Sequence, residues 1–155
     1  MAKRFLLMAA LLPFVPGAAL RAQSPADSAA ITQTALDYIE GWYEGNAERM
    51  QRALHPQLAK RMVSSDPASG ASRLNHMTAE ELVTATRNGY GTRTPEAERR
   101  RDVTILDIYE GVASVKVVAK DWIDYLHVVK FDNRWVIINV LWELTPEAKR
   151  QMGGR

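Results

Sequence analysis

Histidine and aspartate side chains are the residues of this chain best suited to move a proton. His55 precedes a proline, His127 lies in the middle of an apolar run, and Asp107 interrupts an apolar strand face two residues before Tyr109. Burial in an apolar pocket can tune the pKa of such a group for general acid–base catalysis. If the protein is an enzyme, His127, Asp107 and His55 are therefore the candidate catalytic residues.

Each candidate also has a purely structural interpretation. His55 could bond a carbonyl at a helix end, a neighbour could satisfy His127, and Asp107 could point to solvent. The remaining histidine, His76, falls in a polar segment. No two histidines have the spacing of a metal-ligand pair, and the chain has no cysteine. We therefore predict no metal site, no thiol chemistry and no cofactor.

Aromatic side chains recur at helical and strand spacings along the chain. Core packing explains many such residues, but a small domain could also use them to line a cavity for a flat apolar or heteroaromatic molecule. Trp122 belongs to this aromatic set. The candidate ligand-binding residues are Tyr38, Trp42, His55, Tyr109, Tyr125, His127 and Trp142.

Three helices are predicted in the first half of the chain. An apolar stripe from Ile31 to Trp42 predicts a helix of about 16 residues that ends near Gly45, with Asp27 or Ser28 as its cap. Asn46 caps a second, short helix that stops at His55-Pro56. A capping box opens a third helix at Thr78. The polar residues 64–76 are interpreted as a loop.

Four strands are predicted in the last third, at 102–110, 112–122, 123–131 and 134–144. The fourth is apolar on both faces, so both of its faces must be covered. The helices can cover one face, and a partner subunit or the C-terminal segment must cover the other. We favour a homodimer through the outer sheet face.

Residues 1–22 have the three parts of a secretory signal peptide: a basic start, a short apolar run and a stretch of small residues. The apolar run is too short for the roughly 20 residues of a membrane-spanning helix. We expect cleavage after Ala22, export to the periplasm or the extracellular space, and no membrane contact afterwards. Residues 23–155 then form a single domain with its core at about 28–145.

The charge of the chain changes with this cleavage. Loss of Lys3, Arg4 and Arg21 leaves 17 basic and 18 acidic residues, a net charge of −1 instead of the +2 of the whole chain. A nearly neutral domain has no general attraction for nucleic acid, and acids flank its one basic run, Arg99-Arg100-Arg101. No nucleic-acid partner is predicted.

Three segments give the chain a family resemblance: GWYEGNAERMQRALHP, RLNHMTAEELV and DYLHVVKFDNRWVIINVLWE. With these, residues 28–145 resemble the nuclear transport factor 2-like superfamily, in its SnoaL-like or "putative lumazine-binding" branch. The resemblance implies an α+β fold, in which a cone-shaped, curved antiparallel sheet of about four strands packs on three N-terminal helices. A pocket is expected at the wide end.

Three functions fit this fold, because members of the superfamily differ in activity and function must be argued from the site. The first is an exported pocket domain that binds a small, partly apolar or heteroaromatic ligand without catalysis. The second is an acid–base isomerase, dehydratase or cyclase. The third is a homo-oligomeric assembly module. We favour the first, because no active-site pattern of a characterised relative maps onto this chain residue by residue.

Overall fold

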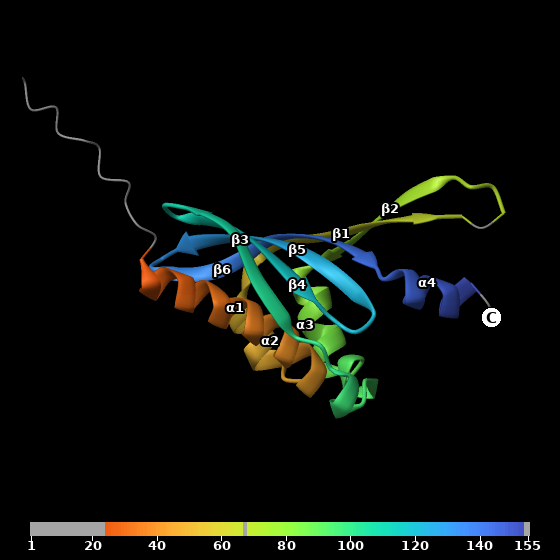
Figure 1. The fold of residues 1–155 in the computed structure, drawn as a ribbon, viewed down its shortest axis with the longest axis horizontal. Coiled ribbons are helices and arrows are strands. Elements are labelled where there is room, and N and C mark those ends of the chain that lie inside the picture. Colours follow the sequence, from red (N-terminus) through yellow and green to blue (C-terminus); the bar gives the residue numbers. More distant parts are fainter. Residues whose placement is uncertain (1–23, 67, 154–155) are drawn as a thin grey trace, which may run out of the picture.

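A six-stranded sheet with helices packed on one face forms the body of the protein (Figure 1). The computed structural model describes residues 24–66 and 68–153. The strand order is β2-β1-β6-β5-β4-β3. In chain order the elements are α1 (Pro25–Glu44), α2 (Ala47–Ala53), β1 (Leu54–Ser65), β2 (Ser72–Thr78), α3 (Ala79–Arg87), the short 3-10 helices η1 (Gly91–Arg93) and η2 (Glu96–Glu98), β3 (Asp102–Tyr109), β4 (Val112–Val118), β5 (Trp122–Phe131), β6 (Arg134–Leu144) and α4 (Pro146–Gly153).

The four predicted strands correspond to β3, β4, β5 and β6, which pair antiparallel in sequence order. The expectation of four strands and three helices is nevertheless incomplete. Two further strands, β1 and β2, extend the sheet beyond β6. A fourth helix, α4, follows β6 in the chain. The β1–β6 pair is parallel, so the sheet is mixed rather than purely antiparallel.

The missed strands form a hairpin where the sequence predicted a helix end and a loop. Apolar and polar residues do not alternate clearly over residues 64–76, and most side chains of β2 are exposed. The period of two that marks a half-buried strand is therefore weak there. Pro56 lies inside β1, where the pairing with β6 is interrupted between Leu54 and Ala59. Proline has no N–H to donate to a ladder, and an irregularity of this kind accommodates it.

The helix ends follow the predicted signals closely, with one exception. Gly45 adopts the left-handed conformation (φ 68°) that ends α1, and the Asn46 side chain accepts a hydrogen bond from the Arg49 amide at the start of α2. The capping box of Thr78 and Glu81 is present at the start of α3. The exception is α1, which already begins at Pro25. The Asp27 carboxylate caps nothing there and instead accepts from Trp135 Nε1 and Lys130 Nζ, each at 2.9 Å.

The predicted leader, residues 1–22, lies outside the described residues. Within the described part of the chain, no helix combines the length and the apolar character needed to cross a bilayer.

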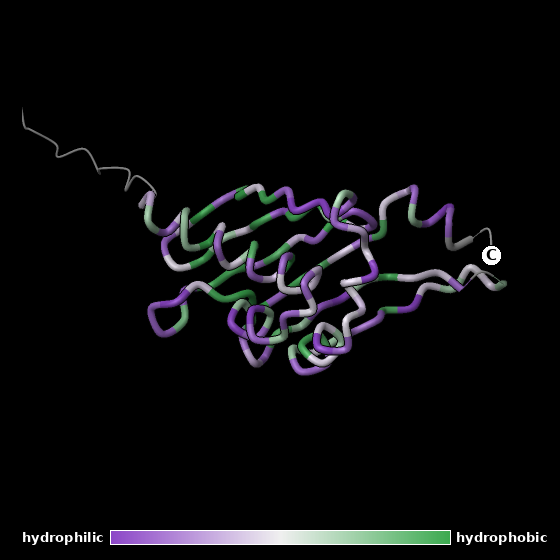
Figure 2. The backbone as a smooth tube through the Cα atoms, turned by 90° about the horizontal axis from the view of Figure 1, so that it is seen from below, coloured by the Kyte–Doolittle hydropathy of each residue, from purple (hydrophilic) through white to green (hydrophobic). Residues whose placement is uncertain are grey.

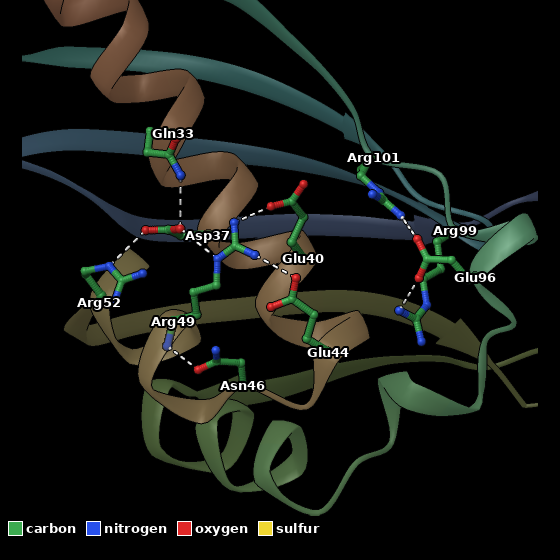
Figure 3. A network of polar contacts seen from close by, with 10 residues as sticks. All are labelled: Gln33, Asp37, Glu40, Glu44, Asn46, Arg49, Arg52, Glu96, Arg99 and Arg101. Carbon is green, nitrogen blue, oxygen red and sulfur yellow. Dashed lines mark hydrogen bonds and ion pairs between the residues drawn. The ribbon is translucent and has the colours of Figure 1, made fainter.

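An ion-pair network fastens α1 to α2 on the side away from the sheet (Figure 3). Arg49 pairs with three acids of α1, and two of its contacts are 3.0 Å to Asp37 and 2.9 Å to Glu44; the third partner is Glu40. Arg52 pairs with the second carboxylate oxygen of Asp37. Burial favours the neutral form of Asp37, but these two arginines and Gln33 outweigh it and lower its pKa. These ion pairs join α1 to α2 and help to hold α1 in position over the sheet.

The core lies between these helices and the inner face of the sheet. Hydrophobic positions concentrate on the strands, and hydrophilic positions on the turns (Figure 2). Paired residues on neighbouring strands point to the same face, so Lys60, Val140, Leu126 and Val115 form one row across the inner face. Apart from Lys60, the members of this row are fully buried and apolar. One cationic side chain therefore stands in an apolar layer.

Candidate functional site

An apolar cavity of about 530 Å³ opens between α1, α3 and the β1–β2 end of the sheet. Three tryptophans, three methionines and one lysine are among its lining residues. The full lining is Tyr38, Ile39, Trp42, Met50, Lys60, Met62, Ser64, Met77, Leu82, Trp122, Trp142 and Leu144. Lys60 is the only ionisable group of this lining besides the Tyr38 phenol. A mainly apolar wall with one or two polar groups is typical of a small-molecule site.

A buried polar cluster forms the floor of the cavity. Lys60 Nζ donates to Asp124 Oδ1 at 2.6 Å and to the Tyr38 hydroxyl at 2.8 Å. The other carboxylate oxygen of Asp124 accepts from Tyr38 at 3.2 Å and from Trp122 Nε1 at 2.7 Å. Asp124 has no exposed surface, and the Lys60 side chain is 9% exposed. The buried charge is thus compensated within the cluster.

Aromatic rings surround the Lys60 ammonium on the cavity side. Its Nζ lies 4.7 Å from the centroid of the Trp142 ring and 5.5 Å from that of Tyr38. A cation held over a ring face is attracted by the ring quadrupole. Trp42 and Trp122 meet edge to face, with their ring centroids 6.3 Å apart. The wall around the ammonium is therefore flat-sided and aromatic.

Burial sets the protonation of this cluster. It lowers the pKa of Lys60, while the Asp124 carboxylate acts in the opposite direction and offsets part of that effect. Burial and the Asp124 charge raise the pKa of Tyr38 well above its ordinary value. Tyr38 is consequently a neutral phenol that accepts from Lys60 and donates to Asp124.

Three of the seven predicted ligand-binding residues line this cavity: Tyr38, Trp42 and Trp142. Their role in binding remains a prediction. Trp122, part of the predicted aromatic set, lines it too and hydrogen-bonds Asp124. The cavity wall therefore combines predicted aromatic residues of α1, β5 and β6.

Asp107 and Tyr109 face away from the helices, so an inward-facing Asp107 is the wrong interpretation of its strand. A bulge between Ile105 and Asp107 shifts the register of β3 against β4, and Ile108 takes the inner position. Asp107 is exposed, and Tyr109 is 72% exposed. Neither residue contributes to the cavity.

Tyr125 and His127 also lie on the outer face, because Asp124, Leu126 and Val128 occupy the inner positions of β5. An inward cluster of Tyr125 and His127 with the aromatic residues of α1 is therefore wrong. His127 Nδ1 lies 3.3 Å from the side-chain nitrogen of Asn139. A shallow groove of about 340 Å³ passes His127, Asp107 and Tyr109 on this outer face.

His55 is buried but does not line the cavity. Its ring packs edge to face on Phe131, with centroids 4.7 Å apart, and its Nδ1 accepts from the Gln57 amide at 3.1 Å. The structural interpretation of His55 is thus the better one, with an amide N–H as partner in place of a carbonyl. His76 is exposed on β2.

Two central residues of the cluster were not predicted, namely Lys60 and the buried role of Asp124. Asp124 lies two and four residues before Leu126 and Val128, so the three side chains point to the same face of the strand. This spacing could have indicated a buried carboxylate that requires a cationic partner. Leu58, Lys60 and Met62 lie at alternate positions, and this period of two could have indicated a strand in the segment after Pro56, for which no element was predicted.

A larger groove, of about 800 Å³, runs along α2 and α3. Its lining is mainly polar and charged and includes Glu48, Arg52, Glu80 and Arg87, all of them exposed. Size alone does not make a binding site. We consider the apolar cavity the candidate site, because it combines aromatic walls with a buried donor.

Comparisons with known proteins agree with this architecture. The family model described as "Putative lumazine-binding" matches residues 26–143. A protein of unknown function from Shewanella baltica OS155, described as NTF2-like, has 18% identity and a TM-score of 0.64, over 81% of this chain and 98% of its own. Another from Methylobacillus flagellatus KT has 21% identity and a TM-score of 0.61, over 79% of this chain and 95% of its own. No curated protein matches the chain. At these identities the structural likeness shows the fold alone.

Proposed function

The chain belongs to the "Putative lumazine-binding" family of the nuclear transport factor 2-like superfamily, and from this premise we propose that it binds a small, flat, partly apolar or heteroaromatic ligand without catalysis. The observation that supports this proposal is the aromatic cavity with the Lys60 ammonium at its floor. A concave apolar surface of this size can bury most of a small molecule and make many packing contacts with it.

The cluster chemistry favours binding over acid–base catalysis. A general base needs a free lone pair near the substrate. Asp124 already accepts from Lys60, Tyr38 and Trp122, and it lies behind the lining residues. The groups first considered for catalysis, His127, Asp107 and His55, lie outside the cavity.

Filling the cavity should abolish binding. We expect Met62→Trp to weaken binding of the neutral fluorescent probe N-phenylnaphthylamine by at least roughly tenfold, because the larger ring occupies the volume that the probe would take. The measurement is the rise in probe fluorescence on titration, together with quenching of the cavity tryptophans.

Val63→Trp is the matched control. Val63 is the next residue of the same strand, points to the opposite face and is 49% exposed, so the same substitution there should leave binding unchanged. Equal binding by both variants, or no probe bound by the unsubstituted protein, would contradict the proposal.

We also propose that the protein is exported, on the grounds of the leader features of residues 1–22, and that it forms a homodimer through the outer sheet face. Apolar side chains are exposed on that face: Val112, Tyr125 and Leu141 are between 47% and 54% exposed. The C-terminal helix α4 leaves Leu141 uncovered. Exposed apolar area of this kind favours a partner, and a second copy would present the same surface.

A charge on the outer face should prevent this dimer. We expect Leu141→Asp to convert a dimer into a monomer, because two copies of the carboxylate would be buried in one interface. Light scattering at several concentrations measures the mass. Tyr90→Asp, at a 51% exposed position in the turn between α3 and η1, is the control and should leave the mass unchanged. A monomer without any substitution would refute the dimer.

A further inference from the structure

The hydrogen bonds of Lys60 leave one proton without a conventional acceptor. An ammonium has three N–H donors. One goes to Asp124 Oδ1 at 2.6 Å and one to the Tyr38 hydroxyl at 2.8 Å. Among the described residues Nζ has no third hydrogen-bond acceptor, and it lies over the Trp142 ring, 4.7 Å from the ring centroid. An aromatic face is a weak partner that a carbonyl oxygen can replace.

The other polar atoms of the floor are already engaged. The Tyr38 hydroxyl donates to Asp124 and accepts from Lys60, and Trp122 Nε1 donates its only proton to Asp124. The cavity therefore offers a guest one strong, directed donor at its floor, surrounded by apolar and aromatic side chains.

The charge balance selects the kind of acceptor. Asp124 already compensates the ammonium, so the cluster is neutral overall. A ligand oxygen at hydrogen-bond distance from Nζ, about 2.8 Å, would lie within roughly 5.4 Å of Asp124 Oδ1. A carboxylate there would add an uncompensated buried charge beside an existing one, whereas a neutral carbonyl would not.

We infer that the cavity recognises a neutral aromatic or heteroaromatic carbonyl compound whose oxygen accepts the free N–H of Lys60. This inference rests on the proposed ligand-binding function and specifies the class of ligand. It assigns Lys60 as the residue that orients the ligand, with Tyr38 and Asp124 holding the ammonium in place.

Three compounds of nearly equal size test the inference: acetylnaphthalene, ethylnaphthalene and naphthoate. They are a neutral ketone, a hydrocarbon and an anion, and the affinity of each is measured by its competition with N-phenylnaphthylamine. The variant is Lys60→Met combined with Asp124→Asn, which removes both charges at similar volume and keeps an acceptor for Tyr38 and Trp122. Circular dichroism and binding of the probe itself confirm that the variant has folded.

The ratio of ketone affinity to hydrocarbon affinity is the readout, since hydrophobicity cancels when this ratio is compared between the two proteins. We expect the ratio to fall by about tenfold or more in the variant, the loss expected for a hydrogen bond from a charged donor. We also expect naphthoate to bind the unsubstituted protein more weakly than the ketone. A ratio that is equal in both proteins, or tighter binding of naphthoate, would overturn the inference.

A second measurement needs no substitution. The infrared stretch of an isotope-labelled carbonyl in bound acetylnaphthalene should lie at a lower frequency than in an apolar solvent, because a hydrogen bond weakens the C=O bond. A stretch at the apolar-solvent frequency would refute the contact with Lys60. If the unsubstituted protein binds neither the probe nor any of the three compounds, the proposed function fails. If it binds them without preference, only this inference fails.

Discussion

Replacement of Asp124 by alanine is expected to destabilise the protein by about 3–5 kcal/mol, because removing one partner of a buried ion pair leaves the other charge uncompensated. Asp124 is fully buried, and Lys60, Tyr38 and Trp122 all donate to its carboxylate. The alanine variant would leave three buried donors without their acceptor. Urea denaturation, followed by circular dichroism, measures the change in the free energy of unfolding.

Removing the whole pair should cost far less than removing half of it. We expect Lys60→Met with Asp124→Asn to recover most of the lost stability, since this pair of substitutions removes both charges at similar volume and the asparagine carbonyl still accepts from Tyr38 and Trp122. Asp107→Ala, an exposed aspartate on β3, is the control and should change stability by no more than about 0.5 kcal/mol. A double variant as unstable as Asp124→Ala would show that the ion pair is not the source of the effect.

The same cluster shows where prediction from the sequence failed. The aromatic residues of the wall were predicted, because Tyr38 and Trp42 follow the helical stripe of α1. Lys60 was missed, because no strand was predicted between the helix end at His55-Pro56 and the loop at 64–76, where β1 lies. An isolated lysine on an apolar strand face has no counterpart nearby in the sequence; its partner Asp124 lies 64 residues away. Only the β1–β6–β5 order of the sheet brings the two together.

The other wrong predictions concern the sheet face to which a side chain points. The alternation of β4 was predicted correctly, and Val115 and Val117 are fully buried as expected. In β3 the bulge after Ile105 reverses the parity of the remaining residues, so Asp107 and Tyr109 point outward. Periodicity alone cannot place such an insertion, because either parity gives a plausible half-apolar face. The predicted face of a strand is thus reliable where the alternation is strict, as in β4, and fails beyond a bulge, as in β3.

Gly91→Ala is expected to have a large effect at a position that no motif indicates. Gly91 is buried in η1 against the last turn of α1. A Cβ atom added there would overlap the carbonyl oxygen of Trp42 and lie 2.6 Å from its Cδ1 atom, closer than real side chains approach. The backbone of α1 cannot yield easily, because the Trp42 carbonyl accepts the Gly45 amide at the helix end. We expect a loss of about 3 kcal/mol in the free energy of unfolding.

Gly91→Ala should also affect the ligand site, because the added methyl group would contact Trp42. Its ring lines the cavity, so an η1 displaced by the new methyl group should also weaken binding of N-phenylnaphthylamine in the fraction that remains folded. Gly111→Ala is the matched control: its nearest neighbour is the Lys130 Cβ at 3.9 Å, an ordinary contact, and we expect a change within about 0.5 kcal/mol and normal binding. Thermal unfolding and probe titration on both variants separate the two effects. Equal stability of Gly91→Ala and Gly111→Ala would mean that α1 and η1 are packed less closely than their contact implies, and that the wall carrying Trp42 can move to admit a ligand.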